Sequence, residues 1–333
     1  MLFGTMAKTA GAAAALGLIA LGLMVLWLPG TAAAQEYPTK PIRLLQGFPA
    51  GGNADVLARV VGDEISKTLG QSVIVEARPG ASGNLASQEI ARATPDGHTL
   101  MLFTTAHVIS PALMKALAFD PVNDFEFITK VADYPFFFAV HNDSPFKTLK
   151  DLIAAAEAKP DGLTWGSAGN GSGQHMGGEL LALSAKIKVR HVPFRGDAGS
   201  VTALLSKSID YIVAPSLVLI GNIEGGNFRA LAITSKTRAQ SLPNVPTVEE
   251  LGHPGFDHQA FAAIATTKGT PPAVVDRLTK VVHAAIAQPG VAKRIVELGG
   301  IPAPNSGAAM KTYVEAQVMR WKDVVTAAGI KAE

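Results

Sequence analysis

Three short segments rich in glycine, alanine and serine are the positions in this sequence best suited to bind an anion. They are Ala50-Gly51-Gly52-Asn53, Ala81-Ser82-Gly83-Asn84 and Gly169-Asn170-Gly171-Ser172. A helix N-terminus offers free backbone N–H groups and the positive end of the helix dipole, and glycine lets that backbone approach a ligand closely. Each segment is a candidate anion cradle. One alone is equally well explained as a tight turn, but three of like composition favour binding.

The segments on either side of these candidate cradles indicate how they are positioned. Residues 42–48 are predicted to form a strand and 54–69 a helix, because apolar residues recur at helical spacing and Gly70 is a natural C-cap. The second half repeats this order, with a helix expected at 149–158 and a strand at 163–166. The rhythm predicts parallel sheets covered by helices. Such sheets bind ligands beyond the carboxyl ends of their strands.

Both halves share this rhythm, so the predicted fold class is α/β with two similar lobes, each a mainly parallel sheet flanked by helices. We expect one discontinuous lobe from residues 35–137 plus 262–333 and a second from 138–261. The chain would cross between them near Phe138 and Phe261. Two cradles that face each other across the cleft would hold both ends of a small dianion.

Composition narrows the function classes. The formal net charge is +2 and the chain has no cysteine. No cluster of Lys and Arg suggests a nucleic-acid partner, and no histidine spacing suggests a metal. Residues 1–34 have the pattern of a signal peptide, with an apolar stretch and an A-x-A site at Ala32 and Ala34. An uncleaved membrane anchor is the competing interpretation.

The ordered motifs of this sequence resemble one known family, the substrate-binding receptors of tripartite tricarboxylate transporters, also called Bug receptors or the TctC family. No single motif is decisive, but the combination is specific and covers nearly all of the chain after residue 34. The matching stretches are residues 37–43 (YPTKPIR), 48–52 (FPAGG) with Asp55, 76–84 (EARPGASGN), 95–100 (PDGHTL), 167–175 (SAGNGSGQH), 191–196 (HVPFRG), 242–247 (LPNVPT) and 269–271 (GTP).

The resemblance implies a periplasmic binding protein of the Venus-flytrap, type II-like fold. It implies that a small organic carboxylate, either a di- or tricarboxylate or an aromatic acid, is held by amides, hydroxyls and water. The expected partners are that ligand and the membrane components of a tripartite tricarboxylate-type transporter, with no catalytic residue, metal or cofactor, and a monomeric receptor. Carried over by position or taken from the cradles, the expected ligand-binding residues are Phe48, Ala50, Gly51, Asn53, Asp55, Ser82, Gly83, Asn84, Thr104, Thr105, Ala106, Ser167, Ala168, Asn170, Gly171, Ser172, Gln174, His175, Arg195 and Asp197.

Four of these residues keep two interpretations. Asp55 either orients a water that bridges to the ligand, as the family implies, or is an acid in the first turn of a helix. Arg195 either pairs with a ligand carboxylate or lines the cleft edge. Asp197, where many relatives have a Gly and a Pro nearby, either neutralises Arg195 or accepts a hydrogen bond from a ligand hydroxyl or nitrogen. His175 either touches the ligand or makes a structural hydrogen bond.

Three other functions compete with solute binding. A serine hydrolase needs G-x-S-x-G after a strand, and Gly171-Ser172-Gly173 does not have that spacing. A dinucleotide site needs a third glycine where this chain has Gln174. A periplasmic sensor that feeds a signalling partner uses the same closed form, so the sequence leaves that alternative open.

Overall fold

The computed structural model describes residues 37–330. Residues 37–39 belong with an N-terminal unit, Met1–Thr39, and the account below concerns the unit that begins at Lys40. The predicted signal peptide at residues 1–34 lies outside the described residues. Within residues 37–330, none of the helices combines the length and apolarity that a bilayer crossing requires.

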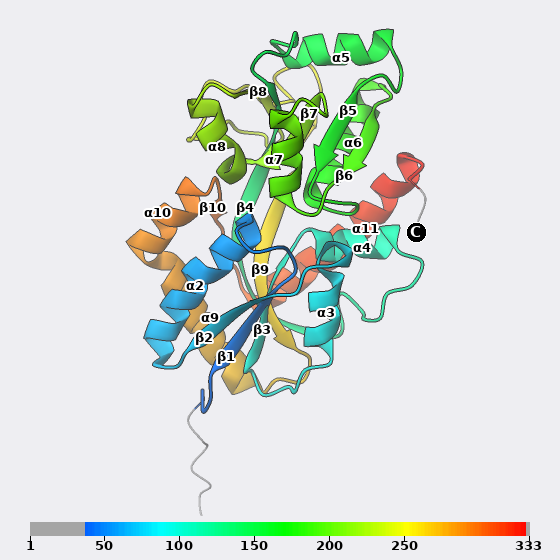
Figure 1. Ribbon diagram of the computed structural model, residues 1–333. Helices are drawn as coiled ribbons and strands as arrows, with labels where there is room; N and C mark the ends of the chain where they lie inside the picture. The colour runs from blue at the N-terminus through cyan, green and yellow to red at the C-terminus, as the bar shows by residue number, and fades with distance from the viewer. Residues whose placement is uncertain (1–36, 331–333) are drawn as a thin grey trace, which may run out of the picture. The chain divides into compact units, whose positions relative to one another are not determined.

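Strands and helices alternate along most of this unit (Figure 1). The strands are β1 (Ile42–Gln46), β2 (Val73–Ala77), β3 (Thr99–Thr104), β4 (Phe125–His141), β5 (Thr164–Ser167), β6 (Arg190–Pro193), β7 (Tyr211–Pro215), β8 (Phe228–Ile233), β9 (Gln259–Thr267) and β10 (Ile301–Pro302). The helices are α2 (Asn53–Leu69), the 3₁₀ turn η1 (Ala81–Gly83), α3 (Asn84–Ala91), α4 (Ala106–Leu113), α5 (Leu149–Ala158), α6 (Gly173–Ala185), α7 (Asp197–Leu205), α8 (Ser216–Glu224), α9 (Pro272–Ala287), α10 (Pro289–Glu297) and α11 (Gly307–Ala327).

The strands pair in the order β2-β1-β3-β9-β4-β7-β5-β6. β1 is parallel to β2 and β3, and β5 is parallel to β6 and β7, as the strand–helix rhythm predicts. β9 and β4, in the middle of the order, are antiparallel to their neighbours. The predicted two-lobed α/β fold is confirmed. Its parallel ladders lie on the two outer sides of the strand order and its antiparallel ladders lie in the middle.

The 17-residue strand β4 takes part in both sheets. Its pairing with β9 in the first sheet ends at Pro135, and its pairing with β7 in the second sheet begins at Phe136. The side chain of Thr234 accepts a hydrogen bond of 2.8 Å from the Phe136 amide at this point. The lobe boundaries proposed near Phe138 and Phe261 stay a prediction.

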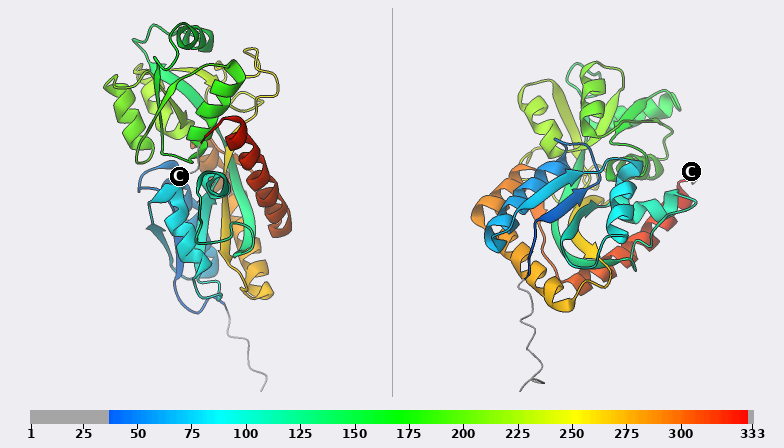
Figure 2. Two further views of the ribbon diagram at one scale, coloured as in Figure 1. Left: turned by 90° about the vertical axis from the view of Figure 1, so that its right-hand side faces the viewer. Right: turned by 60° about the horizontal axis from the view of Figure 1, so that its bottom comes forward.

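Helices cover both faces of the first sheet, with α2, α9 and α10 on one side and α3, α4 and α11 on the other (Figure 2). α2 forms where it was predicted because Leu57, Val61 and Ile65 recur at helical spacing and are fully buried. It ends at Gly70, whose φ of 67° is left-handed and favours glycine. In the second sheet, α6 packs on the face that carries buried Trp165, and α7 packs on the opposite face through Ala203 and Leu204.

Candidate functional site

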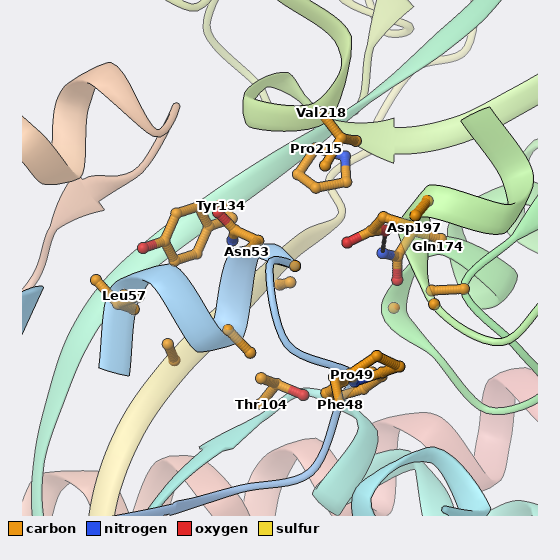
Figure 3. A pocket seen from close by; sticks show the side chains of 18 of the residues that line it. Phe48, Pro49, Asn53, Leu57, Thr104, Tyr134, Gln174, Asp197, Pro215 and Val218 are labelled. Atoms are coloured by element: carbon orange, nitrogen blue, oxygen red, sulfur yellow. Dashed lines mark hydrogen bonds between the residues drawn. The ribbon is translucent and has the colours of Figure 1, made fainter. Parts of the chain in front are cut away.

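A cavity of about 380 Å³, here called the first cavity, lies where loops of both sheets meet (Figure 3). Loops after strands of the first sheet, the starts of helices in the second, and the central strands β4 and β9 form its wall. Ten of the predicted ligand-binding residues line it: Phe48, Ala50, Gly51, Asn53, Thr104, Thr105, Ala168, Gln174, Arg195 and Asp197.

Four helices begin at the first cavity, which makes its wall electropositive. α2, α6, α7 and α8 have their first residues or caps in the lining, represented by Gly52, Gly173, Asp197 and Pro215. The first amides of a helix have no partner within the helix. Gly52, the N-cap of α2, has no side chain that could accept them. The Asn53 amide of α2 donates to Asp197 and the His175 amide of α6 to Ser172, and the aligned dipoles with the remaining amides favour an anion here.

Asp55 fixes the loop that precedes α2 and does not line the first cavity. Its carboxylate accepts hydrogen bonds from the Gly51 amide at 3.1 Å and from Gln46 Nε2 at 3.2 Å, and it pairs with Arg59 at 3.0 Å. Burial opposes its ionisation, yet these contacts, led by Arg59, hold the pKa of Asp55 below its ordinary value. The geometry therefore matches the first-turn acid. A role in orienting ligand-bound water stays a prediction.

Asp197 connects the two sides of the first cavity. Gln174 Nε2 donates to its Oδ1 at 2.8 Å, and the backbone amide of Asn53, at the start of α2, also donates to the carboxylate. Burial raises the pKa of Asp197 to about 6, although both hydrogen bonds favour the ionised form. In Figure 3 the Asp197 side chain faces the opening opposite the N-terminus of α2.

Three further polar groups line the first cavity. Arg195 is exposed, and no ion pair joins it to Asp197 in the part of the chain that the structure describes. Asn53 Oδ1 and Tyr134 Oη are buried without a hydrogen-bond partner. Figure 3 shows the Tyr134 hydroxyl pointing away from Asp197, with the Asn53 side chain beside the Tyr134 ring. Because an unpaired buried polar atom costs free energy, a donor that reached Asn53 Oδ1 would be favourable.

The other two glycine-rich segments open onto a second cavity of about 470 Å³. This second cavity is larger than the first but has no charged lining side chain apart from His175, which is charged only when protonated. The Ser82 hydroxyl donates to the Asn170 carbonyl, so the two segments contact each other directly. Five predicted ligand residues lie here rather than in the first cavity: Ser82, Asn84, Asn170, Gly171 and His175.

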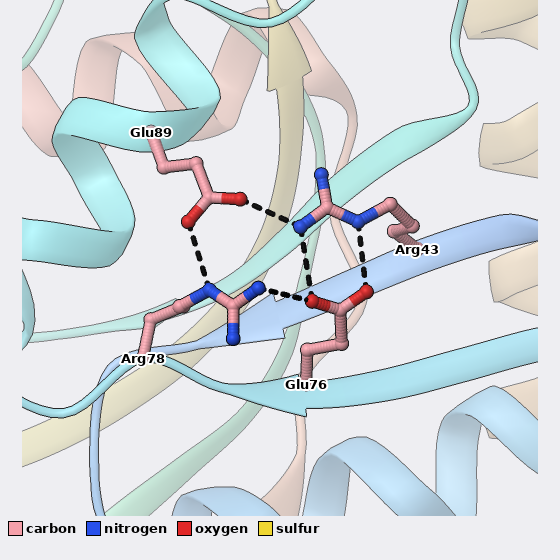
Figure 4. Close-up of polar contacts among 4 residues, drawn as sticks. All are labelled: Arg43, Glu76, Arg78 and Glu89. Atoms are coloured by element: carbon pink, nitrogen blue, oxygen red, sulfur yellow. Dashed lines mark hydrogen bonds and ion pairs between the residues drawn. The ribbon is translucent and has the colours of Figure 1, made fainter.

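A four-residue ion-pair network holds the segment that leads to Ser82 (Figure 4). Arg43 on β1 and Arg78 each contact both Glu76 on β2 and Glu89 on α3, at nitrogen–oxygen distances between 2.6 and 2.9 Å. Hydrogen bonds from Arg43 hold the pKa of Glu76 below its ordinary value, against burial. Gly83 also packs on Gly47, where an added Cβ would come within 2.3 Å of the Gly83 Cα.

His175 makes contacts that match the structural interpretation. Its Nδ1 accepts from the Gly171 amide at 3.2 Å, its ring lies 3.6 Å from Glu179, and it stacks on His191 with ring centroids 4.2 Å apart. The remaining predicted residues line neither cavity and are buried: Asp55, Gly83, Ala106, Ser167 and Ser172. Within the described residues, no group of three or more His, Cys, Asp or Glu is placed to hold a metal.

Sequence reasoning missed the part of the first cavity that the central strands and the start of α8 build. Phe136 lines the first cavity and also belongs to a buried hydrophobic cluster of the second sheet. A hydroxyl within the apolar run of β4 is the one signal that could have pointed to Tyr134. The missed lining residues include Tyr134, Pro215, Val218, Ala260, Phe261 and Ala262.

Comparisons with known proteins agree with this architecture. A family model described as the tripartite tricarboxylate transporter family receptor matches residues 57–330. A curated protein of Cupriavidus necator, named for the gbd 5′ region, is 34% identical over 324 residues, which is 97% of this chain and 96% of that protein.

Two solved structures from Rhodopseudomonas palustris are similar over their whole length. Rpa4515 with adipate has a TM-score of 0.86 and 29% identity and covers 90% of this chain and 100% of its own. MatC with bound malate has a TM-score of 0.81 and 30% identity and covers 87% of this chain and 100% of its own. With the family model, they confirm the resemblance carried by the ordered motifs. The chain belongs to the receptor family of the tripartite tricarboxylate transporters.

Proposed function

We propose that this chain is a periplasmic receptor that captures a small organic carboxylate in the first cavity and delivers it to the membrane components of a tripartite tricarboxylate-type transporter. The observation that carries the proposal is the ring of helix N-termini from both sheets around one cavity of about 380 Å³. Adipate in Rpa4515 and malate in MatC support a carboxylate as the ligand class.

Capture is expected to proceed by closure of the two sheets on the ligand. Contacts that join the two sides already exist between Asp197 and Asn53 and between Ser82 and Asn170. A ligand that contacts both sides binds the closed state more tightly than the open state. This difference in affinity is what a ligand-driven closure requires. The membrane partner would then recognise the closed surface.

We expect binding without turnover. The described pair closest to a nucleophile and its base is Ser167 with His191, whose Oγ and Nε2 are 2.6 Å apart. Ser167 is fully buried and lines neither cavity, so a substrate cannot reach it. The hydroxyl also bonds the Gly169 amide and carbonyl, which is a local structural role.

A thermal-shift screen of di- and tricarboxylates, aromatic acids and amino acids tests the ligand class. A true ligand at a hundredfold excess over its dissociation constant stabilises the fold by about 2.7 kcal/mol. Arg195→Gln is expected to weaken the best ligand about tenfold, because it removes the positive side chain of the lining. Arg294→Gln, which removes an exposed guanidinium paired with Glu297, is the matched control. A purified protein that no carboxylate stabilises would contradict the proposal.

Delivery is tested separately from capture. Uptake of the radiolabelled best ligand is measured in cells that lack the receptor gene and carry either the wild-type chain or Arg195→Gln. Restored uptake with the wild-type chain alone is the expected result. Binding without any effect on uptake would favour the sensor alternative instead.

A further inference from the structure

The wall of the first cavity presents hydrogen-bond acceptors that a bare carboxylate cannot satisfy. Asn53 Oδ1 is buried and has no partner. The Asp197 carboxylate has two recorded donors, Gln174 and the Asn53 amide, out of roughly four lone-pair sites that an ionised carboxylate offers. Asp197 faces the opening opposite the start of α2, whereas the Asn53 side chain lies beside Tyr134 (Figure 3). A ligand group that donates N–H bonds to Asp197 would satisfy acceptor sites that are otherwise left incomplete.

The charges of the lining point in the same direction. Among the described residues that line the first cavity, the charged side chains are Arg195 and Asp197. They carry opposite signs and form no ion pair with each other. A dicarboxylate would bring a second negative charge toward the partly buried Asp197 carboxylate, which opposes binding. A ligand with one negative and one positive group would meet a complementary charge for each at the junction between β6 and α7.

We propose that this receptor selects a carboxylate that also carries a protonated amino group, with Asp197 holding the ammonium and Arg195 with the helix N-termini holding the carboxylate. The inference rests on the proposed function and specifies its ligand as an amino-acid zwitterion. Asp197 is the residue that sets this specificity.

The alternative use of Asp197 is a protonated acid that donates to a second ligand carboxylate. Both recorded partners of the Asp197 carboxylate are N–H donors, so its oxygens are arranged to accept. The pKa of about 6 means that burial alone leaves the charge incompletely stabilised. A ligand cation beside the carboxylate would supply the missing stabilisation and lower that pKa.

The test uses pairs of acids that differ only in the ammonium group: L-aspartate with succinate, L-glutamate with glutarate, and γ-aminobutyrate with butyrate. Affinities are measured by calorimetry for the wild-type chain, for Asp197→Asn, and for the control Asp143→Asn, which removes a carboxylate that is 70% exposed and paired with Lys207. In at least one pair the ammonium-bearing member is expected to bind the wild-type chain at least tenfold more tightly than its partner. Asp197→Asn should abolish that preference, and Asp143→Asn should keep it.

Retained binding of the ammonium-free acid by Asp197→Asn shows that the variant is folded. The inference is overturned if the ammonium-free member binds the wild-type chain equally well or better in every pair, or if Asp197→Asn leaves the preference unchanged. If other carboxylates bind while no member of any pair does, the inference fails and the proposed function stands. If no carboxylate binds at all, both fail.

Discussion

The two cavities are built from segments of similar composition, yet they differ in what those segments do. At the first cavity, the loop before α2 meets the starts of helices in the second sheet, and charged residues stand on the wall. At the second cavity, the segments around Ser82 and Asn170 bond to each other. At both cavities a glycine-rich segment contacts the opposite side, but Arg195 and Asp197 line the first cavity, whereas the described lining of the second has no Asp, Glu, Lys or Arg.

The comparison shows that glycine content alone does not identify an anion site. α2 has 17 residues, and its N-cap, Gly52, has no side chain, so its dipole points at the cavity and its first amide, that of Asn53, donates to Asp197 on the opposite side. The segment 81–84 passes through a 3₁₀ turn with Ser82 at a φ of 54°. Its hydroxyl is used in a contact. The two segments therefore differ in three features: the length of the helix that follows, the N-cap residue, and whether a side-chain hydroxyl is already hydrogen-bonded.

The strongest test of the comparison fills each cavity in turn. Ala198 is exposed in the first turn of α7 and lines the first cavity, and Leu113 at the end of α4 lines the second. Ala198→Trp is expected to weaken the best carboxylate at least a thousandfold, or about 4 kcal/mol, because the indole occupies the ligand volume. Leu113→Trp should change the affinity less than about threefold. Calorimetry measures the affinity of both variants for the best carboxylate. A larger loss of affinity in Leu113→Trp than in Ala198→Trp would make the second cavity the binding site.

A smaller effect is expected from Asp197, the partly buried carboxylate of the first cavity. The folded pKa of Asp197 is about 6, above the ordinary 3.8 of aspartate, so the folded chain binds more protons between these values. The contribution of Asp197 to stability is therefore largest below pH 4 and decreases as pH rises to about 6, by at most about 3 kcal/mol. Tyr134 lines the same cavity and stays neutral over this range, because burial raises its pKa well above the ordinary value.

The measurement compares urea unfolding of wild-type protein and Asp197→Asn at pH 4 and pH 7. We expect the stability of the variant, relative to wild type, to increase with pH. A constant difference between the two proteins would show that the Asp197 carboxylate is as well solvated in the fold as in the unfolded chain. That result would weaken the distinction between the first cavity, lined by charged side chains, and the second cavity.

The smallest expected effect concerns the contact at the second cavity. Ser82→Ala removes the hydroxyl that donates to the Asn170 carbonyl, which should cost the closed state about 1 kcal/mol. Because closure is coupled to binding, ligand affinity should decrease about fivefold. Ser72→Ala, at an exposed position before β2, is the control and should change nothing. An unchanged affinity for Ser82→Ala would mean that this contact does not take part in closure.

The sequence predicted the amphipathic helices closely because their signal is local. α5 spans Leu149–Ala158 as predicted, and α2 begins one residue before the predicted start at 54. Periodic burial and terminal residues such as Gly70 are sufficient for such elements. By contrast, β9 was not predicted as a strand. It is buried along most of its length and shows no alternation, and its antiparallel pairing depends on residues more than 120 positions away in β4.

The candidate site was likewise predictable where it depends on local sequence signals. The loop at 48–53 and the residues Gln174, Arg195 and Asp197 lie at strand–helix junctions, which a pattern of strands and helices identifies. Tyr134 and Val218 enter the wall only because β4 passes between the sheets and α8 starts beside it. The division of the cradles between two cavities also depends on tertiary packing, so local composition could not reveal it.

The continuity of β4 through both sheets has a mechanical consequence. A strand that stays in register with neighbours on either side cannot act as a free pivot, since rotation would break its ladders. Pro135 has no amide hydrogen to lose at the transition, and the register shifts between Lys130 and Ala132 and between Phe138 and Ala139 leave the ladder already irregular nearby. We therefore expect the two sheets to close by a small-angle bend of β4 near Pro135. The intact ladders on either side would then favour return to the open form when the ligand dissociates.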